Sequence, residues 1–203
     1  LTLCLCVVVH AKALTLVEFS MRTTWRWPRD HDESDLIVSE MDEVIPALVA
    51  AVQEQHATGD HYRDDAIRQA MEHQAQLALR PGPVRVDVIV DPPWSDGQIN
   101  SVQVVTGDRP FLVDTVASCL LRHGWRVEDV RHPIIGVKRD RGTIEAVGMP
   151  GRGGCASESW IHIDATAPLG TDIGQAAEQL RDDLCACLDQ VVCATDDWGA
   201  MHE

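Results

Sequence analysis

Residues 80–90 read RPGPVRVDVIV, and the pattern of the chain changes within this stretch. Two prolines and a glycine stop any helix that precedes them, so a domain boundary is predicted at residues 82 and 83. From Val84 to Val90 every second residue is valine, which is typical of a strand with one buried face. A period of two residues begins here, and this change of period decides the fold class.

The residues after this strand continue with signals for a turn, a strand and a helix. Residues 91–97 are rich in Asp, Pro and Gly, and a second strand is predicted over 99–106, so the two strands should form a hairpin. Asp108 is a predicted N-cap, and Pro110 suits the first turn of the helix that follows. Gly124 is the predicted end of this helix.

Three more strands and one long helix are predicted in the rest of the chain. The strands cover 125–138, 143–147 and 160–164, and the helix covers 173–191. From residue 84 the order is strand, strand, helix, strand, strand, strand, helix. Helices packed on one face of an antiparallel sheet satisfy this order. The predicted fold class is therefore α+β, with an ACT-like (ferredoxin-like) antiparallel sheet and helices on one face.

The segment before residue 83 has helical spacing instead. Apolar side chains recur every three or four positions, which predicts a helical hairpin over 40–56 and 62–79. The predicted organisation is an irregular N-terminal arm over 1–35, a helical lead-in over 36–82 and an ACT-like regulatory domain over 83–203. We expect Met21 to be the natural start, so that residues 1–20 are not native. The other interpretation of the apolar N-terminal residues is a signal-like segment.

The composition is that of a globular chain with a strong negative charge. Of the 203 residues, 45% are hydrophobic, and 32 acidic against 17 basic side chains give a formal net charge of -15. Phosphate backbones and anionic membrane surfaces attract positive charge. Neither nucleic acid nor a membrane is therefore an expected partner.

The seven cysteines do not have the spacing of a disulfide framework or of a metal site. Cys185 and Cys187 are two residues apart on a predicted helix, where their side chains face different directions, so they are not interpreted as a metal or redox pair. Thiols packed as small apolar side chains indicate a reducing compartment, and the expected localisation is cytoplasmic.

The loop between the second strand and the first helix is the predicted site. Unpaired backbone N–H groups at a helix N-terminus favour an anion such as an amino-acid carboxylate, and Arg109 could add two hydrogen bonds to it. The alternative is a capped helix with no ligand, because every helix N-terminus has this geometry. The candidate effector-binding residues are Gly107, Asp108, Arg109, Pro110, Phe111 and Asp114.

Other patterns do not predict catalysis. The glycine-rich residues 148–154 precede a predicted strand, whereas a phosphate-binding loop precedes a helix. His132 and His162 lie in predicted strands without a recognisable nucleophile. No dinucleotide-binding glycine motif follows a strand. The sequence therefore predicts no catalytic residue, no metal ligand and no cofactor in this chain.

Three stretches of the chain form a pattern together: VVTGDRPFLVDTV at 104–116, HPIIGVKRD at 132–140 and ESWIHID at 158–164. In this order and at these spacings they resemble the N-terminal ACT-like region of the large bacterial NAD-specific glutamate dehydrogenases. The similarity is strongest over residues 84–201. It implies that the parent enzyme deaminates L-glutamate oxidatively to 2-oxoglutarate with NAD. In that family the catalytic domain lies far downstream, so the resemblance implies a regulatory or assembly role here.

The resemblance also implies the partners. They are the remainder of the parent dehydrogenase, other copies of the chain in a homo-oligomer, and an amino-acid effector. Two other hypotheses remain: a free-standing amino-acid-sensing ACT-like protein, and a small enzyme on a ferredoxin-like scaffold. In amino-acid-binding ACT domains a glycine often follows the Asp-Arg-Pro run, and here that position is Phe111. We expect its ring to fill the ligand pocket.

Overall fold

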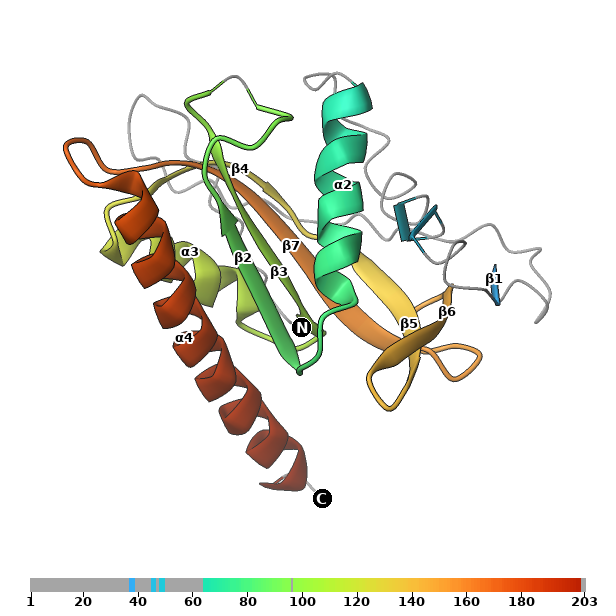
Figure 1. The fold of residues 1–203 in the computed structure, drawn as a ribbon. Helices are drawn as coiled ribbons and strands as arrows, with labels where there is room; N and C mark the ends of the chain where they lie inside the picture. The colour runs from blue at the N-terminus through green and yellow to red at the C-terminus, as the bar shows by residue number, and fades with distance from the viewer. Residues whose placement is uncertain (1–36, 39–44, 47, 50–63, 96, 202–203) are drawn as a thin grey trace, which may run out of the picture.

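The computed structural model of the chain describes residues 37–38, 45–46, 48–49, 64–95 and 97–201. Three helices and seven strands are defined within them (Figure 1). In chain order these are β1 (Ile37–Val38), α2 (Asp64–Ala78), β2 (Val84–Ile89), β3 (Asn100–Gly107), α3 (Leu112–Arg122), β4 (Arg126–Arg131), β5 (Ile134–Asp140), β6 (Thr143–Gly148), β7 (Ala156–Thr166) and α4 (Ile173–Met201).

The strands form one antiparallel sheet with β7 near its centre. The strand order is β1-β6-β5-β7-β3-β2, and β4 also pairs with β7. One edge of β7 pairs with the whole of β3. The other edge of β7 pairs first with β5 and then with β4. The 11 residues of β7 are long enough for two partners in succession.

The single strand predicted over 125–138 is wrong, because the structure has two strands there. The break falls at His132 and Pro133, between β4 and β5. Proline has no N–H for the ladder, so regular pairing stops at this residue. The carbonyl oxygen of Pro133 still accepts a hydrogen bond from the Trp160 N–H at 3.0 Å, which keeps the break attached to β7.

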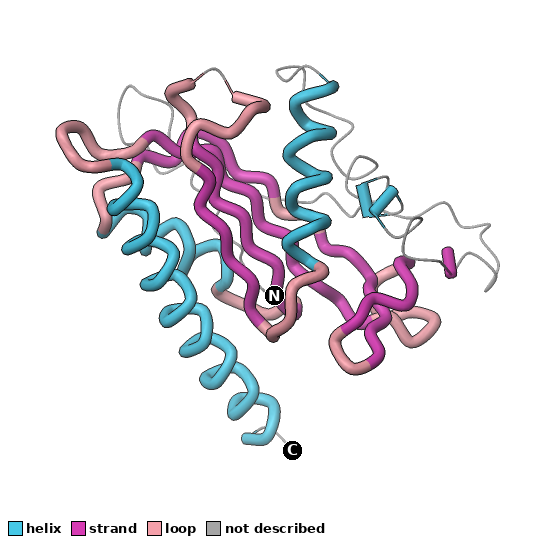
Figure 2. Tube along the Cα trace, viewed as in Figure 1, coloured by secondary structure: helices cyan, strands magenta, loops and turns pink. Residues whose placement is uncertain are grey.

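Each face of the sheet carries its own apolar core. On one face, the valines of β2 and β3 and the isoleucines of β7 pack against α3 and α4; this core includes Val86, Val104, Leu120, Ile161 and Leu184. On the other face, α2 packs over Val105, Ile135, Val137 and Trp160. Figure 2 shows the strands lying between α4 and α2. The alternation of side chains along each strand separates the two cores.

The predicted fold class is confirmed as an α+β, ACT-like antiparallel sheet. Both helices of residues 83–203 lie on one face, as expected. The second helix of the predicted hairpin is α2, and it covers the opposite face. Most of the first predicted helix and the arm over 1–35 lie outside the described residues. Leu48 and Val49 are described, and both are buried in the core beneath α2.

Two arginines bind the carbonyl groups at the end of α2. Arg139 donates to the Ala78 carbonyl at 3.0 Å and holds Glu158 through two hydrogen bonds of 2.6 and 3.0 Å. Arg85 donates to the Arg80 carbonyl at 2.5 Å. Unpaired carbonyl groups at a helix C-terminus need such donors. These contacts attach α2 to β2 and β5.

Candidate functional site

The loop between β3 and α3 holds the predicted effector residues, and Asp108 lies at its start. The Asp108 N–H donates to the Ser157 carbonyl at 2.8 Å, and its carboxylate accepts from the Ser159 hydroxyl at 2.6 Å. Asp108 is therefore bound to β7 and is not the N-cap of α3, so that prediction is wrong. The helix begins at Leu112, three residues later than an Asp108 cap would require.

Phe111 occupies the N-cap position of α3 in a left-handed backbone conformation. Its φ is 71° and its ψ is 3°, values that favour glycine, and no side chain caps the helix. Phe111 is 57% exposed. The described part of the chain does not enclose its ring, so the expectation that this ring fills a ligand pocket stays a prediction.

Arg109 binds the end of α4 and does not point into an open loop. One terminal nitrogen donates to the Val192 carbonyl at 3.2 Å and to the Thr195 hydroxyl and the Asp196 carboxylate at 2.9 Å each. Its side chain is 20% exposed, and that of Asp196 is 68% exposed. We call this set of contacts the Arg109 latch. It joins the predicted effector loop to a helix more than eighty residues away in the sequence.

The remaining predicted residues complete the loop and the first turn of α3. Gly107 ends β3, and its carbonyl accepts a weak hydrogen bond from Arg109 at 3.4 Å. Pro110 is exposed, and Asp114 is exposed in the first helical turn. Asp114 stabilises the positive end of the helix dipole but opposes an anion bound there. An acidic effector would therefore need Arg109 to overcome the charges of the neighbouring carboxylates.

His132 lies close enough to this loop for the Asp108 charge to act on it, a grouping that the sequence did not predict. Its Nε2 atom and the Thr106 hydroxyl are buried without a hydrogen-bond partner among the described residues. Burial lowers the pKa of His132 below its ordinary value, and the Asp108 charge opposes this shift. His132 lies in the break between β4 and β5, so strand alternation in the sequence did not predict where its side chain lies.

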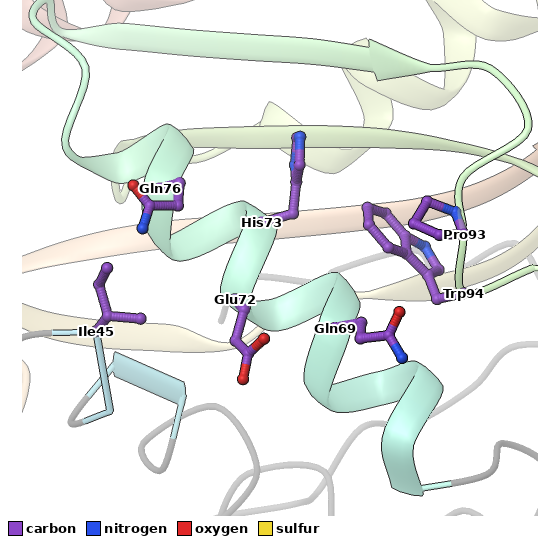
Figure 3. A pocket seen from close by; sticks show the side chains of 7 residues that line it. All are labelled: Ile45, Gln69, Glu72, His73, Gln76, Pro93 and Trp94. Carbon is purple, nitrogen blue, oxygen red and sulfur yellow. The ribbon is translucent and has the colours of Figure 1, made fainter.

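A hollow that the sequence did not predict lies beside α2. It has a volume of about 410 Å³ and is lined by Ile45, Gln69, Glu72, His73, Gln76, Pro93 and Trp94 (Figure 3). The rings of His73 and Trp94 form one side, with their centroids 5.5 Å apart. None of the six predicted effector residues lines this hollow.

A buried polar network holds the His73 and Trp94 side of the hollow in place. The Trp94 indole N–H donates to the Ser101 hydroxyl at 3.1 Å, and His73 Nδ1 contacts the Gln103 side-chain oxygen at 2.8 Å. The Gln103 amide nitrogen contacts His162 Nδ1 at 3.2 Å. In turn, His162 Nε2 contacts the Asp164 carboxylate at 3.0 Å.

This network contains serine, histidine and aspartate but not the arrangement of a hydrolase. The Ser101 hydroxyl donates to the Asp164 carboxylate at 3.4 Å and accepts from the Trp94 indole N–H at 3.1 Å, so its hydrogen bonds go to aspartate and tryptophan and not to histidine. A nucleophilic serine needs a histidine within hydrogen-bond reach to remove its proton. Asp164 is also paired with Arg131. The geometry therefore supports a structural network.

Within the described ranges, no group of three or more His, Cys, Asp or Glu side chains is arranged to hold a metal ion. Among the helices defined there, none combines the length and apolarity needed to cross a bilayer.

Comparison with protein families identifies the chain. The model of the glutamate dehydrogenase ACT1 domain matches residues 47–184, which include α2, α3, the strands β2 to β7 and the first part of α4. A search of curated protein sequences finds no match. The family match spans the three stretches whose resemblance was noted in the sequence. The chain belongs to the glutamate dehydrogenase ACT1 domain family.

Proposed function

We propose that this chain is the N-terminal regulatory and assembly region of an NAD-dependent glutamate dehydrogenase, and that it is not catalytic by itself. The family match over residues 47–184 carries the proposal. The parent reaction would be the oxidative deamination of L-glutamate to 2-oxoglutarate. The proposed partners are the remainder of that enzyme and further copies of the chain in a cytoplasmic homo-oligomer.

NAD would bind in the remainder of the parent enzyme. A dinucleotide pyrophosphate is bound where a glycine-rich turn leads from a parallel strand into a helix N-terminus. The sheet described here is antiparallel, and residues 148–154 lead from β6 to β7. The described residues therefore do not fit the cofactor, and no step of the parent reaction is assigned to them.

The loop over residues 107–111 is the proposed effector site, and an amino acid is the proposed effector. Its carboxylate would compete with Asp196 for the guanidinium of Arg109. Because the Arg109 latch also binds Val192 and Thr195, this exchange would change how the last turns of α4 are held. Regulation would then consist of a change in the contact between the loop and α4.

The proposal is tested first by assaying the purified chain for NAD reduction with glutamate. We expect no turnover, and glutamate-dependent NADH formation would contradict the non-catalytic role. A thermal-shift panel of amino acids then tests the effector site. A ligand at a hundred times its dissociation constant should stabilise the fold by about 2.7 kcal/mol. The shift should be lost in Arg109→Ala and kept in Arg181→Ala, which removes an exposed arginine from α4.

A further inference from the structure

Two cysteines from different helices meet at one arginine. A terminal nitrogen of Arg122 contacts the Cys119 sulfur at 3.5 Å and the Cys187 sulfur at 3.2 Å. Cys119 lies in α3 and Cys187 in α4, and both are free thiols. Cys119 is 1% exposed, whereas Cys187 is only partly buried. One thiol is therefore partly reachable from solvent, and the buried thiol contacts the same guanidinium nitrogen.

The contacts around this pair fix the position of α3 against α4. His123 Nε2 contacts the Asp183 carboxylate at 2.7 Å, one helical turn before Cys187. Leu120 and Leu184 are fully buried in the same interface. Because packed helices do not slide freely, the two sulfurs stay near each other.

In the sequence Cys187 is close to Cys185, whereas in the structure it shares Arg122 with Cys119. Cys185 is its neighbour in sequence, but side chains two residues apart on a helix do not face each other. The charged groups that act on Cys185 are Asp189, Asp182 and Arg181, and Arg122 is not among them. Cys185 is therefore a matched control on the same helix.

We propose that Cys119 and Cys187 form a dithiol modification site, which reacts with low-molecular-weight disulfides and closes into a disulfide between α3 and α4. The arginine is the second feature that points to reactivity, because a guanidinium beside sulfur favours the thiolate, which is the attacking form. Burial raises the pKa of the Cys119 thiol while Arg122 opposes this shift. Cys187 is the attacking thiol because it is the more exposed of the two, and the buried Cys119 reacts second.

The reaction proceeds in two exchanges. The Cys187 thiolate attacks one sulfur of the small disulfide, and the other sulfur leaves as a thiolate with the bonding electron pair. The Cys119 thiol then loses its proton to water and attacks the Cys187 sulfur of the mixed disulfide, which expels the second small thiolate. In sum, two protein thiols are oxidised by two electrons and one small disulfide is reduced to two thiols.

The test treats the full chain with oxidised glutathione and maps its disulfides by mass spectrometry. We expect a peptide that joins Cys119 to Cys187, and no such product in Cys187→Ser or Cys119→Ala. The Cys185→Ser control should still form it. The closed form should melt several degrees higher than the reduced form, roughly the shift that a cross-link of this kind gives a domain of this size.

Arg122→Gln tests the role of the arginine, since the residue is exposed and its replacement leaves the core intact. We expect the first exchange to slow by roughly threefold to tenfold in this variant. A glutathione adduct that persists on Cys187 without closing would overturn the proposal. So would a disulfide that involves Cys185, or a rate that does not change in Arg122→Gln.

Discussion

Phe111 combines a bulky side chain with a backbone conformation that costs most residues about 1–2 kcal/mol. Its φ of 71° lies in the left-handed region, and its ring is largely outside the core. Such strain at a loop marks a position where the side chain serves a purpose other than stability. Because the residue lies between Pro110 and α3, it presents an apolar ring at the proposed effector loop.

Two replacements of Phe111 separate the backbone strain from the ring. Phe111→Gly and Phe111→Ala both remove the ring, but only glycine adopts this φ without strain. We expect Phe111→Gly to be more stable than Phe111→Ala by about 1 kcal/mol in urea unfolding. Equal stabilities would show that the loop relaxes to a negative φ. Because both variants lack the ring, lost packing cannot produce the difference.

His162 is a second residue whose surroundings matter, because they favour one protonation state of its ring. Its Nε2 faces the Asp164 carboxylate and its Nδ1 faces the Gln103 amide, which also donates to the Ala70 carbonyl at 2.8 Å. The neutral ring with its proton on Nε2 satisfies both neighbours. A second proton on Nδ1 would face the amide donor. Burial lowers the pKa of His162 below its ordinary 6.5.

This shift predicts a loss of stability in acid. Above pH 6.5 the ring is neutral in both the folded and the unfolded chain, so the shift has no effect. As the pH falls below that value the unfolded chain binds the proton first, and the free energy of unfolding decreases by up to about 1.4 kcal/mol per pH unit. Melting temperatures between pH 8 and pH 5 measure this slope.

Two variants identify the residue responsible for the slope. His162→Gln should flatten the acid slope, because glutamine does not titrate. His132→Gln removes the other histidine whose pKa is lowered by burial and should flatten part of the slope as well. His132 is also buried with a lowered pKa, so some slope should remain in His162→Gln. If the slope is unaltered in His162→Gln, other groups cause the loss of stability in acid.

At the scale of the elements, the sequence patterns predicted single helices and strands better than they predicted which of these elements pack or pair together. The alternating valines predicted β2, and the structure buries Val86 on the expected face. The breaker at Gly124 also ends α3, with a φ of 75° there. Periodicity reports only which face of an element is apolar. It could not show that β7 takes two partners on one edge, or that α2 covers the face opposite α3.

The candidate site also shows that sequence patterns report local structure and not contacts between distant segments. The sequence placed the six candidate effector residues at the junction of a strand and a helix. In the structure residues 107–111 run from the end of β3 to the N-cap of α3, and Asp114 lies in the first turn of that helix. The sequence could not show that Arg109 binds Asp196, because the two residues are 87 positions apart. It also interpreted Asp108 as a cap, whereas Ser159 from a distant strand takes its carboxylate. Interactions between distant segments decided both cases.

Gly136 shows how tightly β5 packs against β6. It pairs with Gly148, and a Cβ at Gly136 would overlap backbone atoms of Gly148 and Met149. Backbone atoms cannot turn aside as a flexible side chain does. We expect Gly136→Ala to destabilise the fold by about 1–3 kcal/mol, as other overpacked sites do. Chemical denaturation measures the change.

Gly107→Ala is the matched control in another strand. A Cβ at Gly107 would meet only the far end of the Arg109 side chain, at 3.5 Å. Its effect on stability should be much smaller than that of Gly136→Ala. If the two variants unfold at the same denaturant concentration, β5 and β6 do not approach each other at Gly136 as closely as the structure shows.

At the scale of the whole molecule, the Arg109 latch joins the sheet to the far part of α4. This helix extends past the end of β2 beside it (Figure 1), so fewer core contacts hold its last turns. The buried leucines of α4 end at Leu188, and Arg109 binds residues 192–196 beyond them. A single side chain from the loop before α3 thus helps to hold the last turns of the helix.

Removing the latch should therefore loosen one region and spare the rest. In Arg109→Ala we expect amide hydrogen exchange in the turns after Leu188 to accelerate about fivefold. This factor corresponds to a loss of about 1 kcal/mol in the free energy of local opening, which is typical of charged hydrogen bonds near the surface. Exchange in β3 and β7 should stay slow, because the two cores are untouched. Arg181→Ala, which removes an exposed pair on the same helix, should change neither region. Uniform acceleration across the sheet would mean that Arg109 supports the whole fold, and α4 could not then respond separately to an effector at the loop.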